Sequence, residues 1–177
     1  MTRTGLTVAP VLHTERLVLR PHRPADLSAY HELWADPEVV RHISGRPSSR
    51  EETWSRLLRA IGHWHALGFG FWAVEDRASG RLIGELGVAD FRRELTPPME
   101  GAAEAGWLIA PWAQGQGLAT EGVRAALAWA DERLRFARLF CMIAPQNTPS
   151  LRVAAKCGFQ DLGAIAYRGE TTRILQR

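Results

Sequence analysis

A glycine-rich turn from Gln114 to Gly117 constrains this chain more than any other segment. An apolar run from Trp107 to Ala110 precedes it, and an amphipathic stretch that continues to Leu134 follows it. This order predicts a strand, a tight turn and a helix start. Glycines let backbone N–H groups approach a ligand closely, and the first turn of a helix adds unpaired N–H donors and the positive end of its dipole. We therefore expect the segment to bind a phosphate group.

Length and composition indicate one globular domain. The chain has 177 residues, which predicts a single domain over residues 1–177 with one hydrophobic core. Hydrophobic residues make up 46% and charged residues 23%, as is ordinary for a soluble protein. No apolar run approaches the roughly 20 residues of a membrane-spanning helix, and residues 1–10 lack the apolar core of a signal peptide. We expect a cytoplasmic protein without membrane contact.

Charge and cysteine usage argue against further classes. The net charge is +3, but basic and acidic residues are interspersed and no block of five like charges occurs. This pattern argues against direct nucleic-acid binding. Cys141 and Cys157 make neither a disulfide framework nor a metal site. His63 and His65 would diverge around a helix axis, and no third ligand is in view, so no metal is expected.

Hydrophobic periodicity predicts an α+β fold, with two or three helices before a central hairpin and two after it. Capping signals place three helix starts: Asp36 with Pro37, two overlapping Ser-x-x-Glu boxes at 48–52, and Thr148 as N-cap with Pro149 at the first helical position. The expected strands cover residues 11–20, 71–74, 82–89, 104–110, 138–143, 159–167 and 171–175.

Two familiar phosphate-binding devices fit the glycine turn poorly. A Walker loop requires a lysine and a serine or threonine after its last glycine, and Leu118 and Ala119 stand there. A dinucleotide fingerprint requires a third glycine or alanine where Thr120 stands, and the strand at 138–143 carries no acid for a ribose. Helices and strands also fail to alternate as a doubly wound sheet requires.

A third device fits the turn and its surroundings. Residues 114–119 resemble the Gln/Arg-x-x-Gly-x-Gly/Ala signature of the GNAT superfamily of acyl-CoA-dependent N-acyltransferases. The segments 13–20, 33–39, 82–85 and 147–159 are similar to the branch that includes the ribosomal-protein N-terminal acetyltransferases, so the resemblance spans nearly the whole chain. It implies a mixed, mostly antiparallel central sheet of about six or seven strands, splayed between the fourth and fifth strands, with helices on both faces.

The resemblance implies acetyl-CoA as the acyl-donor substrate, and no metal. In such a site, main-chain groups of Trp107, Leu108 and Ile109 pair with the pantetheine arm. Asn147, just outside the Thr148-capped helix, offers its amide to the same arm, and Lys156 reaches a phosphate. Asn147 and Lys156 have structural alternatives as a turn-forming asparagine and a solvated lysine, and the alternative for Gly115 and Gly117 is that they simply make a tight turn. The N–H groups expected to face the pyrophosphate belong to Gln114, Gly115, Gln116, Gly117, Leu118, Ala119 and Thr120.

The resemblance also suggests which residues carry the chemistry. Glu104 stands where this branch often has a glutamate, so it is the expected base, acting directly or through water; Glu85 is the alternative base. Many superfamily members place a tyrosine seven residues after the asparagine, but Ala154 stands there in this chain. Ser150 is the substitute in the resembling branch and would donate a hydrogen bond to the leaving thiolate. Alternatively, Ser150 only satisfies N–H groups in the first turn of its helix.

The expected activity is an N-acetyltransferase. It moves an acetyl group from acetyl-CoA to a primary amine, which is either a protein N-terminus or a small-molecule amine, by direct attack in a ternary complex. The alternative is a non-catalytic acyl-CoA-binding sensor or interaction module, which Ala154 favours mildly. The sequence leaves open the identity of the amine, the use of longer acyl groups, and whether the protein is a monomer or a homodimer.

Overall fold

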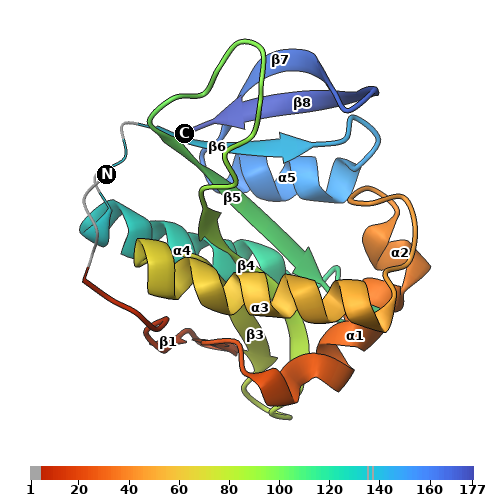
Figure 1. Ribbon diagram of the computed structural model, residues 1–177, viewed down its shortest axis with the longest axis vertical. Coiled ribbons are helices and arrows are strands. Elements are labelled where there is room, and N and C mark those ends of the chain that lie inside the picture. The colour runs from red at the N-terminus through yellow and green to blue at the C-terminus, as the bar shows by residue number, and fades with distance from the viewer. Residues whose placement is uncertain (1–4, 135, 137) are drawn as a thin grey trace.

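The computed structural model describes residues 5–134, 136 and 138–177. Its strands form one eight-stranded sheet, which Figure 1 shows running from the lower part of the molecule to the top. The strands are β1 (Leu12–His13), β2 (Leu17–Arg20), β3 (Phe71–Asp76), β4 (Leu82–Ala89), β5 (Ala102–Ile109), β6 (Arg138–Ile143), β7 (Gln160–Tyr167) and β8 (Glu170–Gln176). Their order in the sheet is β1-β2-β3-β4-β5-β6-β8-β7.

The sheet has eight strands instead of the six or seven expected, because the opening segment 11–20 divides into two strands. The Thr14 N–H donates to the Leu17 carbonyl at 3.0 Å, and the Leu17 N–H donates to the Thr14 hydroxyl at 2.9 Å. These two bonds close a tight turn between β1 and β2, so Leu12 pairs back on Leu19. The expectation of a mixed, mostly antiparallel sheet is confirmed.

The helices are α1 (Leu27–Ala35), α2 (Pro37–Val40), α3 (Arg50–Leu67), α4 (Leu118–Arg133) and α5 (Thr148–Lys156), with 3₁₀ turns at Pro24–Asp26 and Pro111–Ala113. The starts of α2 and α3 agree with their local capping signals. Of the two overlapping boxes, α3 uses the second: the Ser49 hydroxyl accepts from the Glu52 N–H at 3.2 Å, and the Glu52 carboxylate accepts from the Ser49 N–H at 2.8 Å. Gly68, with φ of 79°, ends α3 in the left-handed region.

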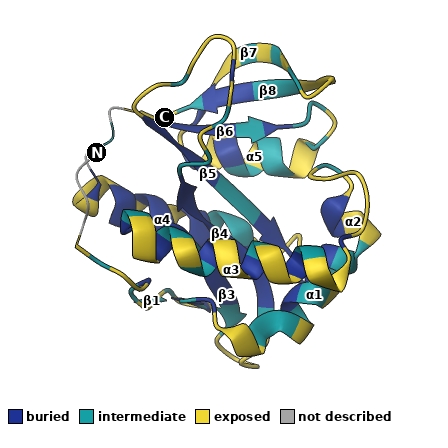
Figure 2. Cartoon of the chain, viewed as in Figure 1, coloured by how far each residue is buried: buried dark blue, intermediate teal, exposed yellow. Residues whose placement is uncertain are grey.

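Helices cover both faces of the sheet, as expected. The Tyr30 hydroxyl of α1 donates to Glu85 of β4 at 2.8 Å. The next side chain, Leu86, lies against Gly122 of α4. Because neighbouring side chains of a strand point to opposite faces, α1 and α4 pack on opposite faces. Figure 1 shows α3 crossing in front of the strands, and Figure 2 shows that its outward side is exposed while the strands behind it are buried.

Three tryptophans in the core connect α3, β3 and α4. Trp72 of β3 makes edge contacts with Trp64 of α3 and Trp129 of α4, at ring-centroid distances of 4.7 and 5.1 Å. All three side chains are buried, and such aromatic pairs contribute about 0.5–1.5 kcal/mol beyond their buried area. Among the described helices, none is long and apolar enough to cross a membrane.

The sheet opens between β5 and β6. These two strands are parallel and pair only at Ala102–Glu104 with Arg138–Phe140. Beyond Glu104, β5 continues along β4 as far as the Ile109–Gly84 pair but no longer pairs with β6. Counting 11–20 as one strand, these are the fourth and fifth strands, so the expected position of the splay is confirmed.

Candidate active site

The glycine turn follows the end of β5 and leads directly into α4. Gly115 and Gly117 have φ angles of 75° and 81°, a region that side-chain-bearing residues rarely adopt. Gly117 is the N-cap of α4 and has no side chain to cap it. In the described part of the chain, the first-turn N–H groups of Leu118, Ala119 and Thr120 have no protein acceptor. The turn therefore presents free N–H donors at the positive end of a helix dipole, which suits a phosphate.

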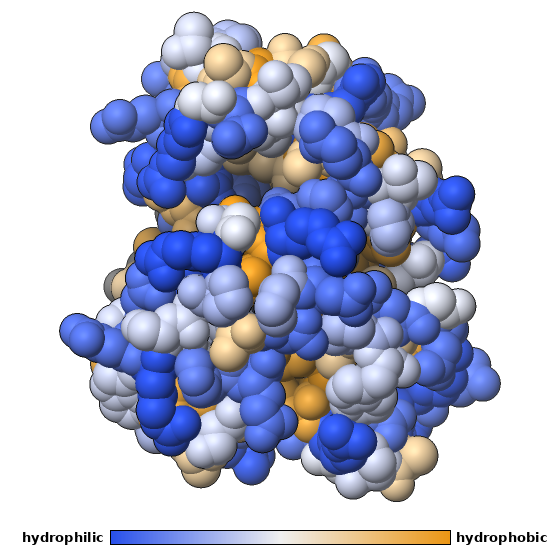
Figure 3. All heavy atoms as spheres, turned by 90° about the vertical axis from the view of Figure 1, so that its right-hand side faces the viewer, coloured by the Kyte–Doolittle hydropathy of each residue, from blue (hydrophilic) through white to orange (hydrophobic). Residues whose placement is uncertain are grey.

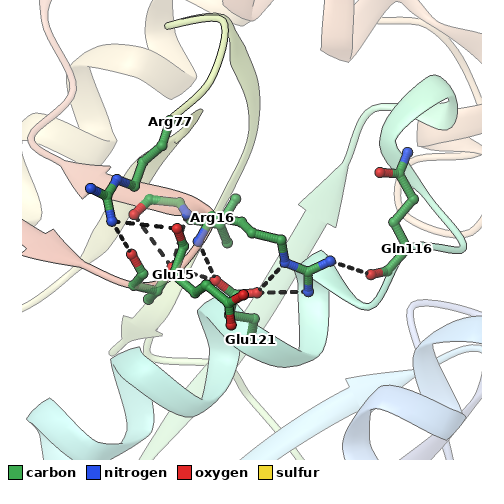
Figure 4. A network of polar contacts seen from close by, with 7 residues as sticks. Glu15, Arg16, Arg77, Gln116 and Glu121 are labelled. Atoms are coloured by element: carbon green, nitrogen blue, oxygen red, sulfur yellow. Dashed lines mark hydrogen bonds and ion pairs between the residues drawn. The ribbon is translucent and has the colours of Figure 1, made fainter.

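Side chains from two directions hold the turn. The Gln114 amide donates to the Ile109 carbonyl at 2.8 Å, which ties the turn to the end of β5. The guanidinium group of Arg16 donates to the Gln116 carbonyl at 2.9 Å and to the Glu121 carboxylate at 2.7 Å, as Figure 4 shows. Sequence reasoning identified Gln114 but missed Arg16 and Glu121. The opening segment at 13–20 was the only signal that could have pointed to Arg16.

Glu121, in the first turn of α4, accepts three kinds of donor. Its carboxylate receives the Thr14 hydroxyl at 2.6 Å, the Arg16 N–H at 2.9 Å and the Arg16 guanidinium. Burial alone would raise the pKa of Glu121, but these hydrogen bonds outweigh it, so the pKa lies below its ordinary value. An ionised carboxylate therefore joins the β1–β2 turn to the start of α4.

The structure corrects the capping of α5. Thr148 was expected to be the N-cap, but Asn147 is: its side-chain carbonyl accepts from the Ser150 N–H at 3.2 Å, and Pro149 falls at the second helical position. Asparagine is the stronger N-cap residue, which explains the shift by one position. The carbonyl of the Asn147 amide is thus used within the helix, and only its NH₂ group is left to face a ligand. Lys156 is exposed at the other end of α5.

The three residues expected to pair with the donor lie on the open side of β5. Trp107 is half-buried and contacts Phe159, with ring centroids 6.4 Å apart. Leu108 packs with Tyr30 and Trp34 on the α1 face. Because β6 no longer pairs with this part of β5, half of its main-chain groups face the gap between the two strands. The structure thus brings these groups next to the glycine turn.

Glu104 stands at the point where β5 and β6 separate. Its buried carboxylate forms a two-point ion pair with Arg93: Nη2 donates to Oε1 at 2.7 Å, and Nε donates to Oε2. Arg93 also donates from Nη1 to the Tyr167 hydroxyl at 3.0 Å. Burial opposes the charge of Arg93, but these contacts outweigh it and raise its pKa. Sequence reasoning singled out Glu104 and missed Arg93 and Tyr167.

The alternative base, Glu85, is enclosed. The Tyr30 hydroxyl donates to its Oε2 at 2.8 Å, and the buried His22 ring lies 3.4 Å from the same oxygen. Burial, together with the Glu85 charge, raises the pKa of Tyr30 well above its ordinary value. Tyr30, His22 and Glu85 are all buried, so this carboxylate is screened from ligands by the α1 side of the core.

Glu85 and Glu104 nevertheless share one face of the sheet. Glu104 is the cross-strand partner of Ala89, and Glu85 that of Leu108, with the Gly87–Gly106 pair between them. A cavity of about 320 Å³ lies beside Glu104, under the connection from β4 to β5. It is lined by Phe91, Arg93, Glu94, Glu100, Glu104 and Phe140, among others. Figure 3 shows the molecule hollowed between the part that carries β6–β8 and the part that carries α1–α3, with hydrophilic side chains on both rims.

Comparison with known proteins identifies this arrangement. Residues 16–160 match the model of the acetyltransferase (GNAT) domain family. A GnaT-family acetyltransferase of Bordetella pertussis is 33% identical, with a TM-score of 0.84, and the match covers 96% of this chain and 99% of that one. The FsC-acetyl coenzyme A-N(2)-transacetylase of Aspergillus fumigatus is 31% identical over 92% of this chain and 70% of its own length.

The ribosomal-protein branch shares the fold. RimL, a ribosomal L7/L12 alpha-N-protein acetyltransferase crystallised in complex with coenzyme A, matches with a TM-score of 0.77 at 20% identity, over 95% of this chain and 97% of that one. Among the described residues, no group of three or more histidine, cysteine, aspartate or glutamate side chains is placed to hold a metal ion. A splayed sheet, a donor-rich glycine turn and these matches agree with one another. The chain belongs to the GNAT acetyltransferase family and is an acyltransferase.

Proposed function

We propose that this protein transfers an acetyl group from acetyl-CoA to a primary amine, by direct attack within a ternary complex. One observation carries the proposal: the open edge of β5 beyond Glu104 leads straight into a turn and a helix start where, among the described residues, the N–H groups of Leu118, Ala119 and Thr120 have no protein acceptor. An open strand edge pairs with the amides of an extended arm, and the turn suits the phosphates at the end of that arm. Coenzyme A carries both features on one molecule.

Different residues would bind different parts of the donor. The N–H groups of residues 115–120 would hold the pyrophosphate, whereas that of Gln114, also expected there, already donates to the Pro111 carbonyl at 3.2 Å. Main-chain groups of residues 107–109 would hold the pantetheine arm. The NH₂ group of Asn147 would donate to the same arm, and Lys156 would reach a phosphate. Free N–H groups of β5 would stabilise the oxyanion that forms when the amine attacks.

Glu104 is the better candidate for the base. An amine at a protein N-terminus has a pKa near 8 and a lysine amine one near 10.4, so an ammonium must first lose a proton. An ionised carboxylate has about four lone-pair positions, and Arg93 occupies one on each oxygen of Glu104. The remaining positions can accept from an amine or from a water beside it. Glu85, in contrast, is enclosed by Tyr30 and His22.

The proposed reaction is balanced by two proton transfers. The ammonium passes one proton to Glu104, directly or through water. The amine nitrogen then bonds to the thioester carbon, the carbon–sulfur bond breaks, and the second N–H proton ends on the sulfur. The Ser150 hydroxyl, half-buried in the first turn of α5, would donate a hydrogen bond to the departing thiolate. The cytoplasm is the proposed compartment, because Cys141 and Cys157 are both free thiols.

The test measures thiol release from acetyl-CoA with a panel of N-terminal peptides, amino acids, polyamines and aminoglycosides. Acceptor-dependent release with intersecting initial-rate lines supports a ternary complex, whereas parallel lines would contradict direct attack. Glu104→Gln should lower kcat about 100-fold, and Ser150→Ala about tenfold, with binding of coenzyme A retained. Tight binding of coenzyme A without release by any amine would favour the non-catalytic alternative.

A further inference from the structure

The acceptor side of the site holds a cation and an anion next to each other. The Arg93–Glu104 pair lies at the wall of the cavity beside β5, and the Tyr167 hydroxyl fixes the third nitrogen of Arg93. Phe91 stacks under the same guanidinium group, with Arg93 Cζ 4.9 Å from the ring centroid. The positions of both charges are therefore set by packing.

Further charges around the pair are segregated. Arg59 of α3 also lies over the Phe91 ring, with its Cζ 5.7 Å from the ring centroid. Arg56, one helical turn earlier, stacks on Trp34 at 4.0 Å. In the described part of the chain, neither of these two arginines forms an ion pair with a carboxylate. The cavity itself is lined by Glu94 and Glu100 as well as Glu104, together with Arg92 and Arg93.

The remaining polar groups do not change this division. Asp90 is paired with Arg92 at 2.9 Å. Burial lowers the pKa of His63, which packs against Phe91, and the charge of Arg59 lowers it further, so the charged form of this ring is disfavoured. With these pairs set aside, α3 contributes the cations Arg56 and Arg59, and the β4–β5 connection contributes the carboxylates of Glu94 and Glu100.

An amine that approaches Glu104 must share this carboxylate with Arg93. A simple amine can use the lone pairs of Glu104 that Arg93 leaves free, but its ammonium then lies beside the guanidinium group, and no anion offsets this like-charge repulsion. A second ammonium on a polycation would also be repelled by Arg59, whose guanidinium group lies over Phe91 at the cavity wall. An acceptor with a carboxylate near its amine avoids both costs, because its ammonium faces Glu104 while its carboxylate accepts from the Arg93 N–H groups that Glu104 and Tyr167 leave free and faces the positive charge of Arg59.

We infer that the acceptor is zwitterionic, a primary amine that carries a carboxylate a few bonds away, and that Arg93 and Arg59 select it. The inference rests on the proposed acetyltransferase function and adds the chemical class of its amine. Two sources share this chemistry: a free amino acid, and a peptide N-terminus with an acidic residue next to it.

Matched acceptors test the inference. The free amino acid arm compares L-alanine with L-alaninamide, and the peptide arm compares the amidated peptides Ser-Asp-Ala-Ala and Ser-Asn-Ala-Ala; spermidine and kanamycin serve as polycations. In at least one arm, kcat/KM, corrected for the fraction of free amine, should be about tenfold or more higher for the carboxylate-bearing member. The arm that shows the preference identifies the source.

Variants then assign the preference to the two arginines. Arg59→Gln and Arg93→Gln should each shrink the ratio several-fold, and Arg93→Lys should fall between wild type and Arg93→Gln because it keeps the charge but loses the two-point contact. Arg133→Gln removes the same charge from an exposed position near the end of α4 and should leave the ratio unchanged. Arg59 is exposed, so Arg59→Gln should fold even if the Arg93 variants do not, and it can then test the inference by itself.

Equal rates within both matched pairs, or a preference for spermidine or kanamycin, would overturn the inference while leaving the acetyltransferase proposal intact. A preference that survives both Arg59→Gln and Arg93→Gln would also overturn it. Absence of release with every amine tested would instead count against the proposed function itself.

Discussion

Arg16 and Glu121 lie 105 positions apart in the chain, yet the Arg16 Nε donates to the Glu121 carboxylate at 2.7 Å. A second nitrogen of the same guanidinium group holds the Gln116 carbonyl inside the glycine turn (Figure 4). The opening hairpin of the chain therefore braces the segment that we propose binds the pyrophosphate.

Loss of this brace should weaken donor binding more than catalysis. Arg16→Met removes the bond to Gln116 and leaves the turn with fewer restraints, so the KM for acetyl-CoA should rise about tenfold, equivalent to about 1.4 kcal/mol, while kcat stays within about twofold. Steady-state kinetics at saturating amine measure both. Arg41→Met, at an exposed position paired with Glu38, is the control and should change neither.

Acid should weaken the same contact between Glu121 and Arg16. The folded-state pKa of Glu121 lies below its ordinary value of 4.5. The contribution of Glu121 to stability is therefore full above about pH 4.5 and is lost as the pH falls through the folded-state pKa. Glu121→Gln should lower the free energy of unfolding at pH 7 and flatten its decline below about pH 4.5. Urea unfolding of both proteins from pH 7 to pH 3 checks this; parallel curves would argue against the assignment.

Asn147 combines a structural role with a proposed binding role, and two substitutions separate them. Asn147→Asp keeps the oxygen that caps α5 but loses the NH₂ group, so stability should be retained while the KM for acetyl-CoA rises. Asn147→Ala loses both and should also reduce the free energy of unfolding by about 1 kcal/mol. Equal losses of stability in the two variants, or an unchanged KM in Asn147→Asp, would contradict the division.

Two helical glycines should respond in opposite directions to the same substitution. A Cβ at Gly122 would lie 2.5 Å from Cδ2 of Leu86 and 3.2 Å from Cδ1 of Leu17, so Gly122→Ala should destabilise the fold by about 1–3 kcal/mol. At Gly62 of α3 a Cβ meets nothing within 4 Å. Gly62→Ala should therefore stabilise the protein by about 0.5–1 kcal/mol. Denaturant unfolding of the two variants provides the comparison.

Elements with local signals could be predicted from the sequence. Ser49 and Glu52 form a capping box within four residues, and the glycines at 115 and 117 provide the backbone freedom that the turn requires. The resemblance supplied the splay, which hydrophobic periodicity alone could not, because unpairing of β5 from β6 depends on how two distant strands diverge.

Contacts across the fold could not be predicted in the same way. Arg93 reaches Glu104 only because the connection after β4 folds back over the Ala89–Glu104 register. Arg16 reaches Glu121 only because the hairpin of β1 and β2 lies beside α4. The error at Thr148 has a different origin: both Asn147 and Thr148 are good N-cap residues, and a proline is tolerated at either of the first two helical positions.

The limited pairing of β5 with β6 has a consequence for how the sheet behaves during turnover. Past Glu104, the edges of β5 and β6 face each other inside the sheet without pairing. Proteins usually cover or blunt unpaired strand edges. With the proposed donor in place, its amide arm would complete the ladder that the protein leaves unfinished. Each catalytic cycle would then add a strand-like partner to the sheet and remove it again. The sheet would thus bind the donor directly as well as support the site.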